Sequence, residues 1–186
     1  MLIENRQIDA YCDMDSGGWM VVQRRIDNST EFNRGWTEYK AGFGSLVKNF
    51  WLGNDNLHLI TSNKKYVYKL LVALEDVYGR RRYAQYETFS IGDETSKYTL
   101  SVGGYSGDAG DGLYRNNGMQ FSTYDHYSDT TCAAVGSGGW WYSYSCFYYA
   151  SNLNGKYLNG TYTAFADGMI WFSSKSYISL KSTTMM

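Results

Sequence analysis

The sequence contains two histidines, His58 and His126, and these are its only side chains whose ordinary pKa lies near neutral pH. A nucleophilic enzyme would need a serine, threonine or cysteine activated by such a base. His58 lies between Leu57 and Leu59 in an expected helix, where a partly buried structural role is the better interpretation. His126 follows Asp125, and no G-x-S-x-G motif flanks it. The histidines therefore do not predict catalysis.

Other catalytic motifs are missing from the sequence as well. It has no phosphate-binding loop, no dinucleotide-binding fingerprint and no zinc-ligand spacing, and the glycine-rich stretch 103–112 lacks the lysine of a phosphate cradle. Two carboxylate pairs, Glu75/Asp76 and Asp93/Glu94, adjoin expected turns and are interpreted as solvated surface. We therefore predict that the protein is not an enzyme.

Three cysteines and two glycosylation motifs bear on the compartment. Cys132 and Cys146 would close a loop of about 15 residues, for which a disulfide contributes roughly 3 kcal/mol in the chain-entropy model. We predict that they are paired rather than two free buried thiols. Asn28 and Asn159 each begin a glycosylation motif ending in threonine, and two such motifs beside a disulfide favour an oxidising, secreted context. Cys12 is left over.

Length and composition limit the class of protein. The 186 residues predict one domain, and 17 Lys and Arg against 18 Asp and Glu indicate neither a nucleic acid nor an anionic membrane as partner. Aromatic residues make up 18% of the chain, which excludes disorder. Apolar runs are too short to span a bilayer. Glu4 and Arg6 interrupt any signal peptide starting at Met1, so we expect a domain cut from a longer secreted protein.

Most of the strands are expected in the first half of the chain. Alternation and β-branched or aromatic content predict strands at 19–26, 66–76, 82–91, 98–102 and 178–185. Alternation within 82–91 predicts a strand with one buried face. Residues 103–168 have hardly any regular periodicity, and a stretch of that length in a compact domain is usually a functional loop. Segregated elements of this kind predict an α+β fold.

Two short helices are expected between the first and second strands. Ser29 or Thr30 would cap the first, and Gly42 and Gly44 would end it. The second would follow Gly53 and Asn54 and carry Leu57, His58 and Ile60.

Short blocks occur in a fixed order along the chain: CDMDSGGWMVVQRR at 12–25, FNRGWTEYKAGFG at 32–44, FWLGNDNLHLIT at 50–61, FST at 121–123, WWY at 140–142, SNLNGKY at 151–157 and ADGMIW at 166–171. From about residue 11 to its end, the chain thereby resembles the fibrinogen C-terminal globular domain, the module of fibrinogen, ficolins, tachylectins, tenascins and angiopoietins. The resemblance implies a twisted mixed or antiparallel sheet with flanking short helices over about 11–102. A loop-rich binding subdomain over about 103–177 and a closing strand at 178–186 would follow. It also implies that Cys12 pairs with a cysteine upstream.

The resemblance bears on calcium. Asp125, Tyr127 and Asp129 occupy the stretch where calcium-binding members carry alternating aspartates. Tyr127 cannot replace a carboxylate, and Cys132 follows so closely that the loop is shorter than in those members. Calcium needs 6–8 oxygen ligands. We therefore predict that the site formed by Asp125 and Asp129 is degraded and binds calcium weakly at most, and no other cofactor is expected.

The resemblance also implies a ligand pocket just after the disulfide loop. Its residues would be Ser145, Cys146, Phe147, Phe165, Ala166 and Tyr177, with a peptide bond before Cys146 that the family often holds cis. Three features depart from acetyl-binding members: Phe147 replaces a histidine, Gly136 stands where a tyrosine is expected, and two residues are inserted before SNLNG. For Phe165 and Tyr177, a place in the subdomain core is an equally good interpretation.

Two functional hypotheses follow. The first is a secreted lectin-type domain that binds carbohydrate or an acetylated ligand at the surface formed by Cys146, Phe165 and Tyr177. The second is an extracellular matrix or signalling domain that contacts a protein through a tyrosine-rich loop containing Tyr144, Tyr148 and Tyr149, beside the expectedly buried Trp140 and Trp141. Under either hypothesis, any oligomer would form through upstream regions.

Overall fold

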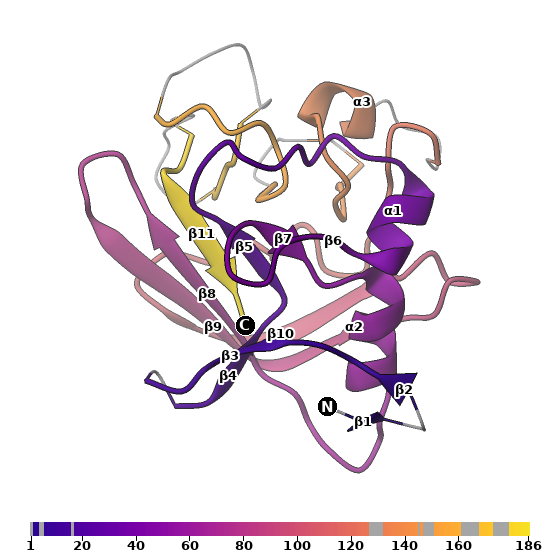
Figure 1. The fold of residues 1–186 in the computed structure, drawn as a ribbon. Coiled ribbons are helices and arrows are strands. Elements are labelled where there is room, and N and C mark those ends of the chain that lie inside the picture. The colour runs from indigo at the N-terminus through magenta and orange to yellow at the C-terminus, as the bar shows by residue number, and fades with distance from the viewer. Residues whose placement is uncertain are drawn as a thin grey trace.

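A seven-stranded antiparallel sheet dominates the fold (Figure 1). In the computed structural model, residues 2–3, 6–15, 17–126, 132–144, 146, 151–160, 168–172 and 179–186 are described. The strand order of the main sheet is β10-β9-β8-β11-β5-β7-β6, and β1–β2 and β3–β4 form two small sheets. The strands are β1 (Leu2–Ile3), β2 (Arg6–Gln7), β3 (Tyr11–Asp13), β4 (Trp19–Val21), β5 (Gln23–Arg25), β6 (Phe43–Gly44), β7 (Phe50–Trp51), β8 (Leu70–Glu75), β9 (Arg81–Ile91), β10 (Leu100–Gly107) and β11 (Ser182–Met185).

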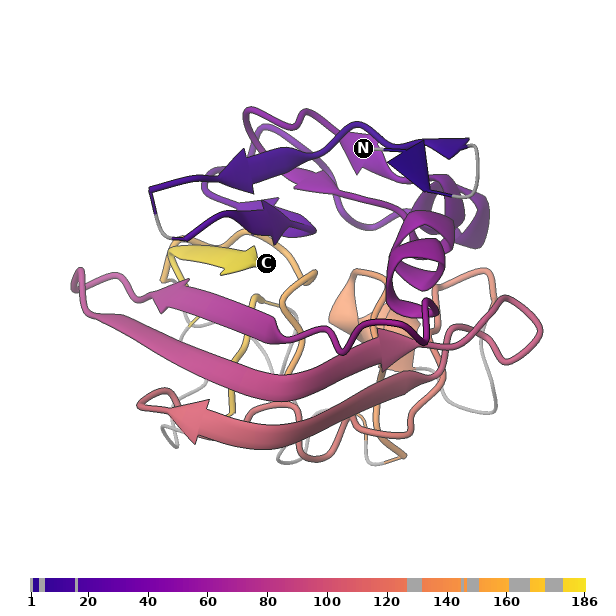
Figure 2. The ribbon, with the colours of Figure 1, turned by 90° about the horizontal axis from the view of Figure 1, so that it is seen from below.

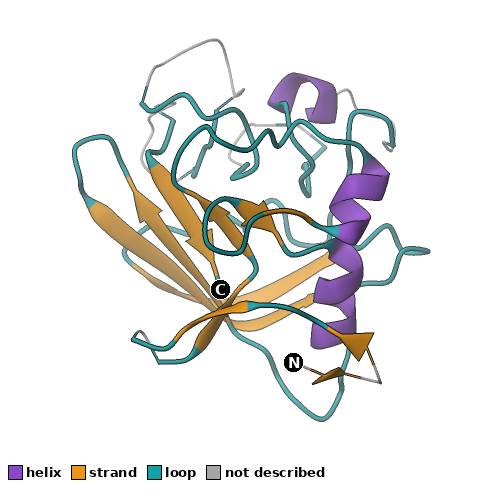
Figure 3. Cartoon of the chain, viewed as in Figure 1, coloured by secondary structure: helices purple, strands orange, loops and turns teal. Residues whose placement is uncertain are grey.

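Three short helices complete the described elements: α1 (Trp36–Ala41), α2 (Asn54–Thr61) and α3 (Cys132–Gly136). Helices α1 and α2 stand along one side of the sheet, while α3 belongs to the loop-rich half at the top of the view (Figure 3). The predicted α+β class, with a sheet, short helices and a loop-rich half, is confirmed. None of the described helices is long and apolar enough to cross a membrane.

The predicted strand at 19–26 is two strands that belong to different sheets. The chain breaks at Val22, whose N–H donates to the Met185 carbonyl (2.8 Å) and whose carbonyl accepts the Leu52 N–H (2.9 Å). The break lets β4 pair with β3 while β5 joins the main sheet beside β11. Alternation alone could not reveal this break, because it continues through Val22.

The predicted caps of the first helix are wrong. Helix α1 begins at Trp36, after Gly35, whereas Ser29 and Thr30 lie in bends. Carboxylates hold these bends: Asp27 accepts the Ser29 N–H (2.8 Å), and Glu31 accepts the N–H of Phe32 (2.8 Å). Such side-chain contacts to the backbone compete with helix formation.

The predicted end of this helix is confirmed at Gly42. Its φ of 92° lies in the left-handed region, and a Cβ there would stand 2.6 Å from the Leu52 carbonyl oxygen. Only glycine fits both conditions. The second predicted helix is also confirmed, except that Asn54 lies inside α2 rather than before it.

Strand β9 has buried side chains on both of its faces, whereas the sequence predicted one buried face. Along β9, Ala84 and Tyr86 are buried on one face, and Phe89 and Ile91 are buried on the other. The Tyr86 hydroxyl donates to Asp111 (2.7 Å), whereas Ile91 lies beside α2. The buried side chains therefore change from one face of β9 to the other between Tyr86 and Phe89. Strand β10 continues to Gly107, beyond the predicted end at 102, whereas β8 and β11 begin later than predicted, at Leu70 and Ser182.

One continuous core joins the sheet to the loop-rich half. Trp51 of β7 contacts Trp141 with ring centroids 6.0 Å apart, and Tyr39 of α1 contacts Phe121 at 5.2 Å. Trp140 and Trp141 are fully buried, as predicted. The loops are thus built directly onto the aromatic face of the sheet.

Candidate functional site

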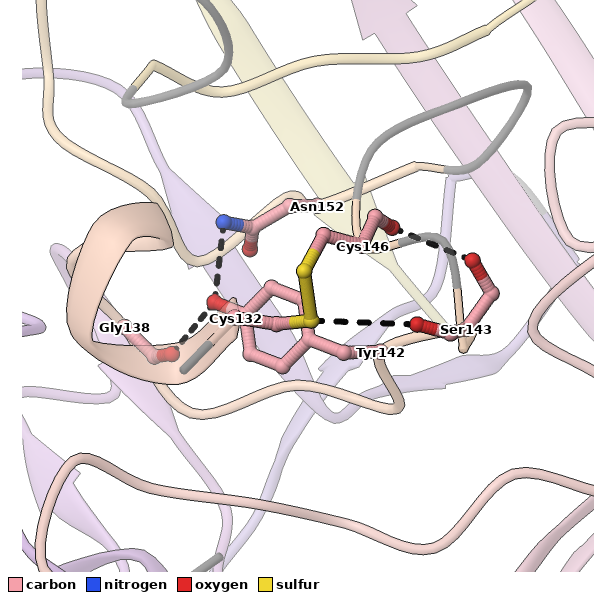
Figure 4. The surroundings of a disulfide bond; sticks show 6 residues. All are labelled: Cys132, Gly138, Tyr142, Ser143, Cys146 and Asn152. Carbon is pink, nitrogen blue, oxygen red and sulfur yellow. Dashed lines mark hydrogen bonds between the residues drawn. A yellow bond between two sulfur atoms is a disulfide. The ribbon is translucent and has the colours of Figure 1, made fainter. Parts of the chain in front are cut away.

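The candidate site is the turn closed by the predicted disulfide, which the structure contains (Figure 4). Cys132 opens α3 and is fully buried, and its Cα lies 5.1 Å from that of Cys146. The disulfide therefore fixes the turn to the buried interior of the loop-rich half. Among the described residues, Cys12 is a free, exposed cysteine on β3.

A tight turn from Ser143 to Cys146 stands on this disulfide. The Cys146 N–H donates to the Ser143 carbonyl (2.9 Å), and the Ser143 hydroxyl donates to the Cys146 carbonyl (3.1 Å). Cys146 has φ 55°, an uncommon conformation for a residue with a side chain that persists only where the surroundings hold it. Tyr144 is 87% exposed on this turn. The turn thus presents an aromatic side chain on a covalently anchored backbone.

Buried hydrogen bonds beside the turn join the Tyr142 hydroxyl, the Asn152 side-chain amide and backbone carbonyl groups (Figure 4). The Tyr142 hydroxyl donates to the Gly138 carbonyl (2.6 Å), and the Asn152 amide donates to the Gly136 carbonyl (3.0 Å) and the Tyr142 oxygen (3.1 Å). Burial raises the pKa of Tyr142 well above its usual value, so its phenol stays neutral. A Cβ at Gly136 would stand 2.4 Å from the Tyr142 oxygen. The phenol of Tyr142 therefore packs against position 136, where the resemblance to acetyl-binding members implies a tyrosine.

The 151–157 block anchors the loops through residues to which sequence analysis assigned no role. Asn154 donates to the Gly139 carbonyl (2.9 Å), and Gln23 of β5 donates to the Leu153 carbonyl (3.1 Å). Arg25 of β5 donates to the Gly155 carbonyl (2.8 Å). Gln23 and Arg25 are two residues apart, so they lie on the same face of β5, and that face is buried, whereas Arg24 between them is half-buried. The sequence did not show which of these polar side chains face inward, because all three residues of β5 are polar or charged.

Most residues of the predicted pocket lie outside the described part of the chain. These are Ser145, Phe147, Phe165, Ala166 and Tyr177, together with Tyr148 and Tyr149 of the tyrosine-rich loop. The structure places Cys146 and Tyr144 on one turn but does not test whether the other residues join them. The pocket and the cis bond before Cys146 remain predictions.

Asp125, one of the two predicted calcium ligands, holds two chain segments together. Its Oδ1 accepts the Trp36 N–H (2.9 Å) and the Thr123 hydroxyl (2.7 Å), and so ties α1 to the loop at 121–126. Burial acts to raise the pKa of Asp125, but these hydrogen bonds outweigh it and hold the pKa below its usual value. Asp129 lies outside the described residues. Over the part of the chain that is described, no three His, Cys, Asp or Glu side chains gather as a metal site would require.

The prediction of a degraded calcium site rests on Tyr127 and the short loop before Cys132, and from it we expect calcium to stabilise the protein very little. If the dissociation constant is above about 1 mM, then 1 mM calcium adds at most about 0.4 kcal/mol to the free energy of unfolding. The melting temperature should then rise by no more than about 2 °C, measured by thermal melts in chelator and across a calcium titration. Asp125→Asn should melt alike with and without calcium. A rise of many degrees at sub-millimolar calcium would show an intact site.

The histidines have structural contacts. The His58 Nδ1 lies 3.0 Å from the Ile91 carbonyl oxygen, which joins α2 to β9 as a structural histidine would. His126 stacks on Trp36 with ring centroids 4.0 Å apart, and the Trp36 indole donates to Glu94 (3.0 Å).

The two glycosylation motifs lie near each other on the surface. Asn28 and Asn159 are both exposed. The Tyr157 hydroxyl donates to the Ile26 carbonyl (3.2 Å), which brings the segments that carry them together. Glycosylation itself remains a prediction.

Comparison with known proteins gives consistent matches over the whole chain. Residues 1–186 match the family model "Fibrinogen beta and gamma chains, C-terminal globular domain". Human fibrinogen-like protein 1 is 43% identical over 199 residues, covering 96% of this chain and 62% of that protein. The chain thus spans less than two thirds of this curated relative.

Two solved structures are similar in fold and sequence. The fibrinogen-like globe domain of human ANGPTL2 has a TM-score of 0.90 and 41% identity, covering 99% of this chain and 88% of that one. A lamprey fibrin D-dimer, complexed with the peptide ligand Gly-His-Arg-Pro-amide, has a TM-score of 0.85 and 34% identity, covering 95% of this chain and 63% of that one.

Proposed function

This chain belongs to the fibrinogen C-terminal globular domain family, and from that premise we propose that it is a secreted, non-enzymatic recognition domain whose ligand binds at the disulfide-closed turn. The observation that carries the proposal is the turn itself. A covalently anchored backbone with a left-handed Cys146, held above buried hydrogen bonds, is pre-organised for binding. The disulfide also suits an oxidising, extracellular compartment.

The proposed ligand is a carbohydrate or an acetylated molecule. The predicted pocket residues Phe165 and Tyr177 would supply apolar walls for a methyl group or a sugar face, with Cys146 contributing backbone groups. A cationic peptide of the kind bound by the lamprey fibrin is not the proposed ligand. Fibrin-type pockets place an aspartate at the position of Ala166, and alanine cannot neutralise an incoming amine.

Protein contact through Tyr144 is the second candidate function. This side chain is 87% exposed although it stands on an anchored turn. Tyrosine combines a large apolar area with a polar hydroxyl and loses little conformational freedom on binding, so it is frequent at binding hot spots. A partner with a matching recess would gain an anchored contact at this position.

A glycan array, with acetylated non-sugar compounds as a second panel, tests the first candidate. The domain should be tetramerised so that weak binding sites act together. Retention on acetylated glycans and on the acetylated non-sugar compounds is expected, with loss on their deacetylated counterparts. Equal binding to acetylated and deacetylated forms would contradict acetyl recognition.

Substitution of Tyr144 separates the two candidates. Tyr144→Ala should leave the melting temperature unchanged, because so exposed a side chain adds little to stability. If a protein partner uses it as an anchor, its affinity should fall by about tenfold or more. The control is Tyr78→Ala, which removes a tyrosine that is 71% exposed on the turn between β8 and β9. Equal affinities for the two variants would contradict the anchor.

A further inference from the structure

Three consecutive arginines, Arg80 to Arg82, stand at the hairpin that joins β8 and β9. This arginine hairpin (residues 76–82) projects from the left of the molecule in Figure 1 and again in the perpendicular view of Figure 2, away from α3. All three arginines are exposed, and the exposed Lys181, just before β11, adds a fourth cation. The balanced charge of the whole chain therefore does not describe this end of the sheet.

Two carboxylates of the hairpin lie beneath these cations and are already bonded to them. Asp76 accepts the backbone N–H of Arg80 (3.0 Å) and its Nε–H (2.6 Å). Glu75 accepts from the Nε of Arg81 (3.0 Å) and the Nζ of Lys181 (2.7 Å). The side chains of Asp76 and Glu75 are 23% and 16% exposed, against 63% and 84% for Arg80 and Arg81. The hairpin therefore presents its positive groups to solvent and its negative groups to the protein.

The guanidinium groups keep most of their donors. Arg80 and Arg81 use only Nε in their ion pairs, so their Nη groups stay open within the described chain. No carboxylate among the described residues pairs with Arg82; Asp108, at the end of β10, accepts the Tyr83 N–H (2.8 Å) instead. A guanidinium offers its donors as a planar fork that fits two oxygens of one oxyanion. Three such forks stand side by side in the sequence.

Arg80 and Arg82 both line one hollow of about 80 Å³. The rest of its lining includes the apolar side chains of Leu74, Trp171 and Leu180 and the paired Asp76. Pockets for a whole small molecule measure about 300–1,000 Å³, so this hollow has room for one small group only. An anionic group seated there would meet two arginines beside an apolar wall, where charge-assisted hydrogen bonds are strong.

Arg81 stands on the other face of the hairpin. In the register of β8 and β9, Arg82 pairs with Leu74, whereas Arg81 pairs with Glu75. Neighbouring residues of a strand point to opposite faces, so one small anion cannot reach both arginines. A ligand that uses the whole hairpin must carry several anionic groups along a chain.

We propose that the arginine hairpin binds an extracellular sulfated polysaccharide, with one sulfate group in the hollow at Arg80 and Arg82 and others at Arg81 and Lys181. Sulfate esters stay ionised at physiological pH, and their oxygens suit the open guanidinium forks. Clusters of Lys and Arg are typical of both heparin and nucleic-acid patches. The disulfide of this chain favours the extracellular compartment, where sulfated polysaccharides are the common polyanions.

Calorimetry with a heparin hexasaccharide tests the proposal. Saturable binding is expected, and log K should fall with log[NaCl] at a slope of about −2 to −4 for this number of contacts. Arg80→Gln combined with Arg82→Gln should weaken binding by about tenfold or more and make the slope shallower by about 2. The matched control is Lys64→Gln combined with Lys65→Gln, which removes the same charge from the exposed loop between α2 and β8 and should bind within about twofold of the original chain.

Glu75→Gln should act in the opposite direction. It removes a negative charge and releases Arg81 and Lys181 from their ion pairs, so heparin affinity should rise by about threefold. A gain in affinity cannot come from a misfolded variant, so this measurement keeps the proposal testable if the arginine variants fail to fold. Unchanged or weaker binding by Glu75→Gln would count against the hairpin.

Other outcomes would overturn the proposal. Equal weakening by the arginine and lysine double variants would reduce the effect to net charge. An unsulfated heparosan hexasaccharide that binds as tightly as heparin would show that sulfate is not recognised. Single-stranded DNA of equal charge that binds as tightly would make the hairpin a site for any polyanion.

The residues that line the hollow include none from the disulfide-closed turn, so this proposal and the proposed function fail separately. Serine variants of Cys132 and Cys146 should lose the ligand of the turn and still bind the heparin hexasaccharide.

Discussion

Replacing Cys132 and Cys146 together with serine is expected to lower the free energy of unfolding by roughly 2–4 kcal/mol and to abolish ligand binding at the turn. The stability loss follows mainly from the greater freedom of the unfolded chain. Binding is lost for a different reason: the Ser143–Cys146 turn, with its left-handed Cys146, depends on the buried anchor at Cys132. Urea unfolding and a ligand-binding assay measure the two effects, and Cys12→Ser is the control because Cys12 is exposed and free.

Hydrogen exchange on the double variant should locate the damage. Strands β8, β9 and β10 pair continuously with one another and should keep their protection, whereas amides of α3 and of the turn should exchange faster. Below the turn, aromatic contacts such as Trp51 with Trp141 cross between the two halves and should limit how far the loosening spreads. Uniform loss of protection would show that sheet and loops unfold as one cooperative unit.

Local sequence signals predicted the parts of the fold that local chemistry decides. Gly42 ends α1 because its φ of 92° lies in the left-handed region that favours glycine, and this requirement is local. Spacing predicted the disulfide, since the Gly- and Ser-rich segment has little else to order it. The sheet was predicted from the short sequence blocks that resemble the family. Periodicity alone could not predict it, because the strand pairings join segments that are distant in the sequence.

The missed features depend on partners far away in the sequence. Val22 looks like any residue of a continuous strand, yet bonds to Met185 and Leu52 divide that strand between two sheets. The missed cap is a local exception: Asp27 accepts the Ser29 N–H and Glu31 accepts the Phe32 N–H, so bends form where the helix was expected to begin. For the site, sequence predicted the anchored turn at Cys146 and an exposed tyrosine, but not the buried amides that support them, because an asparagine in a loop looks the same whether buried or exposed.

Arg25 is the clearest of these hidden anchors. It is 1% exposed, it donates to the carbonyls of Leu153 (3.3 Å) and Gly155 (2.8 Å), and its guanidinium lies 3.9 Å from the centre of the Phe32 ring. Burial lowers its pKa to about 10, so the side chain is charged at neutral pH. The cost of burying that charge is offset by two carbonyl acceptors and an aromatic face.

Arg25→Ala should therefore destabilise the protein by about 3 kcal/mol or more, because it leaves the Gly155 carbonyl without its Arg25 donor and opens a cavity beside Phe32, while the Leu153 carbonyl keeps only its bond from Gln23. Arg25→Met fills most of the space and removes the charge, so it should cost less, roughly 1–3 kcal/mol for the Gly155 carbonyl that loses its donor. Arg25→Lys keeps a charge, but a strongly hydrated ammonium replaces the planar guanidinium that lies over the Phe32 ring, and it should not restore stability in full.

The neighbouring Arg24 provides the matched control. It is half-buried, lies over the Tyr11 ring at 4.2 Å and donates to the Leu46 carbonyl (3.3 Å), so Arg24→Ala should cost about 1 kcal/mol or less.

The pH dependence of the free energy of unfolding is a second check. Below its folded pKa of about 10, Arg25 is protonated in both the folded and the unfolded chain, so the stability difference between wild type and Arg25→Met should stay constant from about pH 5 to pH 9. Above about pH 10 the folded chain releases this proton while the unfolded chain still holds it, so wild type should gain relative stability as the pH rises further. Equal costs for the alanine variants at 24 and 25 would mean that Arg25 does not hold the loop-rich half onto the sheet.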